Sequence, residues 1–389
     1  MNLIENPLAY NERLLIELVF RGVATTRPEI VEKTGLTGAT VTRLVTGMLG
    51  KGLIREKAER SGAIGQPVRR LSLVPRKAYS IGVNFMRHRF DIALVDLTGE
   101  AIGTQRHEID DITPHSIAEI TSRSLDKILR EANVDRTDLI GAGFSVPGNF
   151  AQDGVSLRAH DYFEALDGLN LRPLLEDSLG LYCAVETDGA CAAIGEYLHG
   201  RARKHRSFFF IHIGHGLGGG TVIDGNLYRG PHGNSSKPGA LFPYNKPRPS
   251  GQDLVETLVS AGAPVSDIAD IEAVAEDYAE SLDGWLTRAA EQLADVARIA
   301  TAFLDPEVIV LGGRLPSTLN SQLVERARRI QLPGPSRGLP NAKIVASSLG
   351  PRTGALGAAS IPVFQGLFPG SVSSRGNAYI DGRRQNGKV

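Results

Sequence analysis

Cysteine is almost absent from this sequence, since Cys183 and Cys191 are the only two among 389 residues. Two cysteines cannot build a disulfide framework, and their spacing is not that of a zinc site. Such scarcity is typical of a reducing compartment. Long apolar runs are also missing, because residues 208–213, among the most apolar, are too few to cross a bilayer. Residues 1–10 lack the pattern of a secretory signal, so we expect a cytoplasmic protein.

The chain also has no net charge, because 43 Lys and Arg balance 43 Asp and Glu. Its composition, 42% apolar and 22% charged, is typical of a globular protein long enough for two or three domains. The charge is uneven, however: residues 1–77 hold 13 basic against 7 acidic side chains. A basic segment on an otherwise acidic chain indicates a polyanionic partner for that segment, although a solvated basic face has the same composition.

The basic segment reads as three short helices. Residues 11–21 carry an apolar stripe with helical spacing, and a second helix is expected from Pro28 to about Thr34. Gly35 ends the helical pattern, and Thr37 is suited to cap a third helix. Two helices joined by a tight glycine-containing turn are typical of a helix-turn-helix.

The third helix has the residues expected of a DNA-reading helix. Small side chains at its start permit close approach to base edges, and Arg43 has the reach to bind guanine or phosphate. The predicted DNA contacts from this helix are Thr37, Ala39, Thr40, Thr42 and Arg43. The alternative is a small three-helix bundle in which the same residues are merely solvated.

A β-hairpin is expected after this helix, with strands at 53–56 and 71–73. Its tip is rich in Gly and Arg, and we predict that Gln66, Arg69 and Arg70 enter the minor groove. An ordinary flexible hairpin is the alternative interpretation. Helix-turn-helix and basic wing together favour a winged helix-turn-helix that binds double-stranded DNA.

From residue 79 onward the pattern changes to strands and glycine turns, which predicts an α/β domain. The predicted strands are 79–85, 90–96, 139–145, 182–186, 208–214 and 308–311. The predicted helices are 116–132, 190–198 and 271–304.

Several motifs follow one another in this part of the chain. They are Gly65–Gln66–Pro67, Val146–Pro147–Gly148, Glu186–Thr187–Asp188, and residues 214–220, 305–313 and 354–359. In their order and spacing the chain resembles the ROK family (repressors, uncharacterised reading frames and sugar kinases) over roughly residues 1–364. The resemblance implies an actin-like (ribonuclease H-like) fold, with two α/β lobes and a cleft that holds a sugar and, in the kinases, ATP.

The resemblance also implies a domain plan. The winged helix-turn-helix spans 1–77 and the ROK domain 78–365, with lobe I at 78–187 plus 351–365 and lobe II at 188–350. Residues 366–389 are rich in Gly, Ser, Asn and Arg, and we predict a disordered tail. Dimers or tetramers are implied, and a dimer suits a palindromic operator.

The chain departs from the family's kinases at three places. Residues 84–88 read Asn-Phe-Met-Arg-His, where the resemblance implies an acidic metal partner and small glycines. Residues 236–240 read Ser-Lys-Pro-Gly-Ala, where it implies a sugar-binding Glu and a zinc-binding His. The stretch 246–253, in place of a Cys-rich zinc loop, has neither Cys nor His. We therefore predict no bound metal, no cofactor and negligible sugar phosphorylation.

Asp188 occupies the position of the general base in the family's kinases, so the resemblance implies a vestigial catalytic residue. The residues alone permit another interpretation, because Asp188 opens a predicted helix and is equally suited to cap it. The glycine-rich loop 214–220 is likewise suited to cradle phosphates or to serve as a plain turn.

The expected ligand contacts are Asn149, Asp188, His232 and Lys237. Lys237 stands where the family keeps a Glu, and this reversal of charge suggests an anionic effector such as a sugar phosphate or a sugar acid. In the alternative, Lys237 points to solvent, as lysine side chains commonly do.

These observations favour a DNA-binding regulator, expected to be a repressor, whose degenerate kinase cleft senses a sugar or a sugar-derived ligand. One alternative is an active ATP-dependent sugar kinase that carries a DNA-binding arm. Another is a DNA-binding scaffold without an effector, in which the ROK domain only dimerises.

Overall fold

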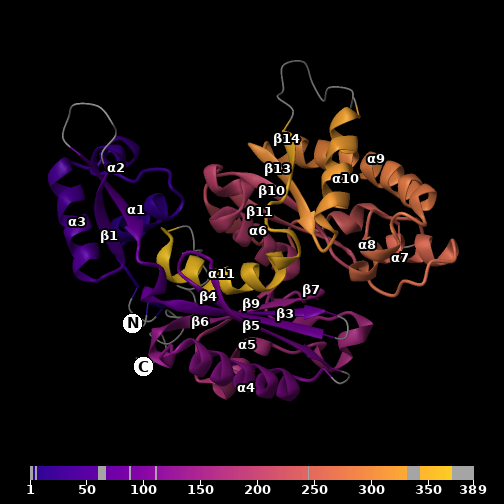
Figure 1. Ribbon diagram of the computed structural model, residues 1–389, viewed down its shortest axis with the longest axis horizontal. Coiled ribbons are helices and arrows are strands. Elements are labelled where there is room, and N and C mark those ends of the chain that lie inside the picture. The colour runs from indigo at the N-terminus through magenta and orange to yellow at the C-terminus, as the bar shows by residue number, and fades with distance from the viewer. Residues whose placement is uncertain are drawn as a thin grey trace, which may run out of the picture.

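The computed structural model describes residues 3–4, 7–59, 67–86, 89–109, 112–243, 245–330 and 342–369. Figure 1 shows three parts: an N-terminal unit, which we call the arm (residues 7–77), and two α/β lobes. No helix in these ranges is both long enough and apolar enough to span a membrane.

The arm has three helices followed by an antiparallel hairpin, as predicted from the sequence. Its elements are α1 (Tyr10–Phe20), α2 (Arg27–Thr34), α3 (Gly38–Gly50), β1 (Ile54–Glu59) and β2 (Val68–Leu73). The Thr26 and Thr37 hydroxyls accept hydrogen bonds from the first turns of α2 and α3, which fixes where these helices begin. Gly35 ends α2 with a φ of 69°, a left-handed conformation that glycine adopts without strain.

Lobe I is built on a five-stranded sheet with the order β5-β4-β3-β6-β9. Its strands are β3 (Tyr79–Met86), β4 (Arg89–Asp96), β5 (Ala101–Glu108), β6 (Leu139–Val146) and β9 (Cys183–Thr187). One face is covered by α4 (Pro114–Ala132) and α5 (Leu171–Leu179), and the other by α11 (Thr353–Leu367). A short ribbon, β7 (Asn149–Phe150) with β8 (Leu157–Arg158), lies beside it.

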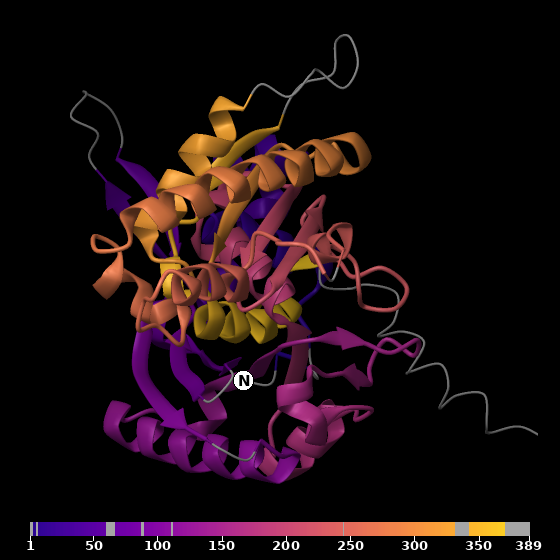
Figure 2. The same ribbon diagram turned by 90° about the vertical axis from the view of Figure 1, so that its right-hand side faces the viewer.

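Lobe II has a second five-stranded sheet, with the order β12-β11-β10-β13-β14. Its strands are β10 (Phe208–Ile213), β11 (Leu217–Ile223), β12 (Asn226–Tyr228), β13 (Val308–Gly313) and β14 (Lys343–Ala346). Its helices are α6 (Asp188–His199), α7 (Gly251–Ser260), α8 (Ile271–Val274), α9 (Ala279–Leu304) and α10 (Ser317–Arg329). The view in Figure 2 shows α11, in yellow, lying between the two lobes.

Helices α6 and α11 pack against each other at the centre of the molecule. Their contact requires glycine, because a Cβ on Gly357 would lie 2.6 Å from the Cys191 carbonyl oxygen. The first turn of α6 is equally close to the lobe II sheet, where a Cβ on Gly189 would lie 2.2 Å from the Gly219 carbonyl oxygen. Helix α6 is therefore held closely on two sides.

Two expectations from the sequence are wrong. The helix expected over 271–304 is interrupted, because Tyr278 leaves helical geometry (φ −115°, ψ 29°) and donates its hydroxyl proton to the Gly262 carbonyl. The disordered tail expected from 366 does not include residues 366–368, because α11 continues to Leu367, and both Leu367 and Phe368 are buried. The Phe368 ring packs edge-on against Phe20 of the arm, with ring centres 5.3 Å apart. Residues 370–389 lie outside the described part of the chain.

Candidate nucleic-acid interface and ligand cleft

The polar face of α3 is open to solvent. Thr37, Ala39, Thr42 and Arg43 are exposed, and Thr40 is half-buried. The Thr37 and Thr40 hydroxyls lie 2.9 Å apart and bond to each other at the start of the helix. Within the described residues the Arg43 side chain has no hydrogen bond or ion pair, so it is free to bind an outside partner.

The arginines of the hairpin lie on an exposed strand and are loosely paired. Arg69 contacts the Glu56 carboxylate at 3.3 Å, and Arg70 contacts Glu59 at 2.9 Å. The Arg70 pair is exposed on both sides, and Glu56 keeps Arg27 as a partner when Arg69 leaves, so these guanidinium groups can exchange a carboxylate for a phosphate at small cost. Gln66 lies outside the described residues.

The arm is attached to the lobes through a buried charged side chain at the end of α1. Arg21 is 4% exposed, and its Nη1 donates to the Tyr197 hydroxyl at 2.8 Å and to Glu17 Oε1 at 3.0 Å. Its Nε and Nη2 donate to the carbonyl oxygens of Arg203 and His205, each at 2.8 Å. Burial raises the pKa of the Tyr197 hydroxyl, which therefore keeps its proton.

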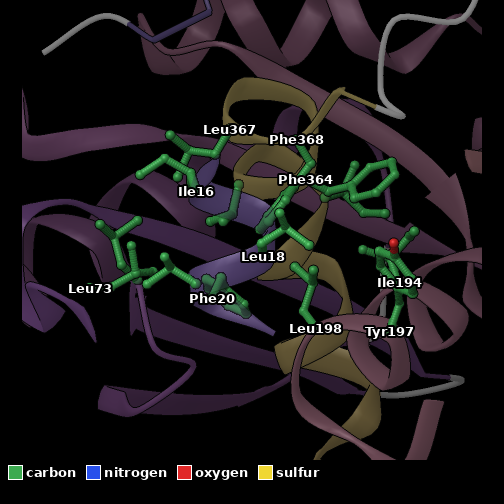
Figure 3. Close-up of a cluster of buried hydrophobic side chains, with 14 of the residues drawn as sticks. Ile16, Leu18, Phe20, Leu73, Ile194, Tyr197, Leu198, Phe364, Leu367 and Phe368 are labelled. Atoms are coloured by element: carbon green, nitrogen blue, oxygen red, sulfur yellow. The ribbon is translucent and has the colours of Figure 1, made fainter. Parts of the chain in front are cut away.

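Apolar packing surrounds this polar contact. Figure 3 shows Ile16, Leu18 and Phe20 of α1 directed toward Phe364 and Phe368 at the end of α11, with Tyr197 of α6 beside them. Sequence reasoning did not find this junction, since its partners lie far apart in the chain.

A cleft of about 1660 Å³ lies between the lobes. Of the predicted ligand contacts, Asn149, Asp188 and Lys237 line it, and His232 does not. The His232 ring instead bonds through Nδ1 to the Gln152 carbonyl oxygen, at 2.9 Å, in an exposed loop. The structure therefore brings three of the four side chains together.

Asp188 is the first residue of α6, and the capping position belongs to Thr187. The Asp188 Oδ1 atom accepts from the Gly189 N–H at 2.7 Å, and its Oδ2 lies 3.6 Å from Nε2 of His212. His212 is 5% exposed, and burial lowers the pKa of its imidazole while the Asp188 carboxylate acts in the opposite direction. Its Nδ1 has no hydrogen-bond partner among the described residues.

Lys237 does not point to solvent, so that alternative is wrong. Its Nζ donates to the Gly148 carbonyl oxygen at 2.9 Å and so reaches from lobe II to lobe I. Burial lowers the pKa of this ammonium group, while the carboxylates of Asp188 and Glu186 raise it. An ammonium group has three donors, and two remain for a bound molecule.

Glu186 lies on β9, two residues before Asp188, and is 7% exposed. The Arg229 guanidinium binds it, with Nε 2.6 Å from Glu186 Oε1. Arg229 pairs with this carboxylate directly, so Glu186 acts on Lys237 only at longer range. Sequence reasoning missed Arg229, as it missed His212, although a histidine within the apolar strand 208–213 was a usable signal.

Three aromatic side chains meet across the cleft. His160 stacks on Tyr162 with ring centres 5.0 Å apart, and both meet His215 of lobe II edge-on, at 5.9 and 6.1 Å. All three line the cavity. Flat apolar faces beside polar groups suit a small ring-shaped ligand with hydroxyl groups.

The end of β3 offers no acidic group. Asn84 lines the cavity with an amide, and the Phe85 and Met86 side chains are buried. Phe85 packs edge-on against Phe90 with ring centres 4.6 Å apart. Residues 87 and 88 lie outside the described chain. Nor do the described residues contain a group of three or more His, Cys, Asp or Glu side chains placed to hold a metal.

Comparison with known sequences gives three relevant matches. Residues 80–247 match the model of the ROK family. The chain is 44% identical to the uncharacterized protein y4fQ of Sinorhizobium fredii over 378 residues, which are 97% of this chain and 96% of that protein. It is 24% identical to the xylose repressor of Bacillus spizizenii over 240 residues, 61% of this chain and 62% of the repressor.

Comparison with solved structures supports the fold. A ROK family transcriptional regulator, a homolog of the Escherichia coli MLC protein, matches with a TM-score of 0.66 at 22% identity, over 93% of this chain and 96% of that one. A ROK family glucokinase from Streptomyces griseus, in complex with glucose and AMPPNP, matches with a TM-score of 0.58 at 21% identity, over 73% of this chain and 99% of that one. The two lobes therefore have the α/β actin-like fold.

Proposed function

The chain is a member of the ROK family, and on that premise we propose that it is a transcription regulator, expected to repress, whose arm binds duplex DNA as a winged helix-turn-helix. The observation that carries the proposal is the exposed face of α3, where the unpaired Arg43 stands beside small polar side chains. The relative named as a xylose repressor supports it.

In the proposed complex, α3 enters the major groove by its first turn and the hairpin lies along the adjoining minor groove. Arg43 contacts a base edge, while Arg69 and Arg70 leave their surface carboxylates for phosphates or the minor groove. A pair of chains, with two arms, reads a palindromic site.

The cleft serves as the sensor for an anionic sugar derivative. In this proposal Asp188 and Asn149, which line the cleft, bind hydroxyl groups, and the remaining donors of Lys237 bind a carboxylate or a phosphate. The ring cluster of His160, Tyr162 and His215 covers the apolar face of the sugar.

Kinase activity is not part of the proposal. Phosphoryl transfer is carried mainly by charges that hold metal and phosphate, and the end of β3 supplies the Asn84 amide in their place. We expect turnover far below the rate of about 1 per second that is typical of kinases. A coupled assay with ATP, Mg²⁺ and a panel of neutral sugars measures sugar phosphorylation. Turnover near that rate would show that the protein is an active sugar kinase.

The test of DNA binding is selection of sites from sheared genomic DNA by the full-length protein, followed by affinity measurement on the selected duplex. Arg43→Ala removes the proposed base contact and is expected to lower affinity by about 1–3 kcal/mol, with relaxed preference at one base pair. Arg123→Ala, on the exposed face of α4, is the matched control. Equal affinity and equal preference for the two variants contradict the proposed reading helix.

A further inference from the structure

A second basic surface lies on the lobes, where the chain leaves α6. Residues 201–206 contain Arg201, Arg203, Lys204 and Arg206, all exposed, and no acidic residue. The short helix Arg201–Lys204 places these cations around the end of α1. A segment far along the chain therefore adds basic side chains next to the basic N-terminal arm.

Two of these cations already have partners in the protein. Arg203 donates to the Phe20 carbonyl oxygen and lies over the Phe20 ring, so it holds the arm in place. Arg206 donates to the Asp224 carbonyl oxygen at 2.8 Å. Neither carbonyl neutralises a positive charge.

Two carboxylates shape the loop without a direct ion pair to the other two cations, and one of them, Glu196, accepts from the Arg201 backbone N–H at 2.8 Å. Glu307 accepts from the backbone N–H groups of Arg206 and Ser207, at 2.7 and 2.8 Å, and contacts the His205 ring at 3.2 Å. Within the described residues, the side chains of Arg201 and Lys204 have no hydrogen bond or ion pair. We call these two residues the seam cations.

The loop that carries the seam cations is bound to the end of α1, four residues before the segment that contacts the hairpin. Arg21 at the end of α1 donates to carbonyls of the 201–206 loop. Four residues later, Thr25 accepts from Arg70 Nη1 at 2.8 Å, and its carbonyl oxygen bonds the Leu71 N–H at 2.7 Å. The 21–25 segment thus contacts the basic loop at one end and the hairpin at the other.

We propose that the seam cations bind backbone phosphates of the same duplex that the arm reads, so that the DNA footprint extends from the arm onto the lobes. The inference rests on the proposed DNA-binding function. A merely solvated basic loop is the simpler use of such residues, but it leaves unexplained why two unpaired cations lie on the loop that is bound to the end of α1. Phosphate contacts of this kind position a protein and carry no sequence information.

The test is the salt dependence of DNA binding by the full-length double variant Arg201→Gln, Lys204→Gln. Each phosphate contact contributes about 0.9 to the slope of log affinity against log salt. On a long duplex that contains the selected site, the slope is expected to fall by about 2, with unchanged base preference. The matched control is Arg123→Gln, Lys127→Gln on α4, which removes the same charge from a helix far from the arm in Figure 1.

A second duplex, trimmed to the base pairs that the arm alone covers, separates direct contact from an indirect effect. On this short duplex the double variant and the wild type are expected to bind alike, because the flanking phosphates are gone. A wild-type slope on the long duplex overturns the proposal, as does a deficit of equal size on both duplexes. If Arg43→Ala abolishes site preference while the seam variant matches the wild type, the arm reads DNA without the lobes.

Discussion

The arm and the cleft use their charged groups in opposite ways. On the arm, Arg43 is unpaired and Arg69 is only loosely held at the surface, so these cations can take up and release an outside anion. At the cleft, Lys237 and the neighbouring pair Glu186 and Arg229 are largely withdrawn from water and held by neighbours. The first arrangement suits a long polyanion bound with strong salt dependence, and the second suits one small molecule in a fixed orientation.

The largest effect is expected from a variant that breaks the junction between the arm and the lobes. In Arg21→Met the Glu17 carboxylate stays buried without its partner, which typically costs about 3–5 kcal/mol. We expect amide hydrogen exchange in α1 to report a loss of that order. The double variant Glu17→Gln, Arg21→Met removes both charges and is expected to recover part of the loss. Unchanged protection of α1 in the single variant would show that the junction does not stabilise the arm.

A smaller effect concerns pH at the same junction. His199 packs against Phe20 with ring centres 5.5 Å apart, and burial lowers the pKa of its imidazole from 6.5 to about 4. Because the unfolded chain binds this proton more readily, stability is full above pH 6.5 and falls as the pH drops toward about 4, by up to a few kcal/mol.

Chemical denaturation across that pH range measures this dependence. His199→Gln is expected to flatten the profile even if it lowers overall stability, because glutamine does not titrate. The exposed His115 of α4 serves as the control, since His115→Gln is expected to keep the wild-type slope. Equal slopes for the wild type and His199→Gln would exclude His199 as the group responsible.

The smallest expected effect sharpens the description of the cleft. Lys237→Met keeps the length of the side chain and removes its charge, so binding of anionic sugars should weaken by about 1.5–3 kcal/mol, the usual value of a hydrogen bond to a charged group. Calorimetry with glucose, glucuronate and glucose 6-phosphate compares neutral with anionic ligands and a carboxylate with a phosphate. Preference of the wild type for neutral glucose, unaltered in Lys237→Met, would contradict an anionic ligand.

Local sequence signals predicted the elements well. Threonine caps, Gly35 and apolar spacing placed α1 to α3 within one or two residues, because these signals act between near neighbours in the chain. Most strands of both sheets were found for the same reason, but the edge strands β5 and β14 were missed, and residues 217–220, expected in a glycine-rich loop, belong to β11. The interruption at Tyr278 was not predictable, since its hydroxyl bonds a carbonyl on a separate loop.

The candidate site was predictable only in part. Asn149, Asp188 and Lys237 were found through the resemblance, and the structure gathers them along one cleft. The pairing of Arg229 with Glu186, and of Arg21 with Tyr197, joins residues far apart in the sequence. Such contacts depend on tertiary packing, and no spacing rule in the chain reports them.

Helix α6 connects the cleft with the arm as one rigid element. Its first residue, Asp188, faces the cleft, and Tyr197 in its last turn holds the arm through Arg21. Nine residues of α-helix span about 14 Å, and close glycine contacts with α11 and with β11 leave this helix little room to bend. A ligand that displaces Asp188 therefore displaces the whole of α6 rather than bending it. Because the arm is held at the other end, we expect a ligand that displaces Asp188 to move the arm as well.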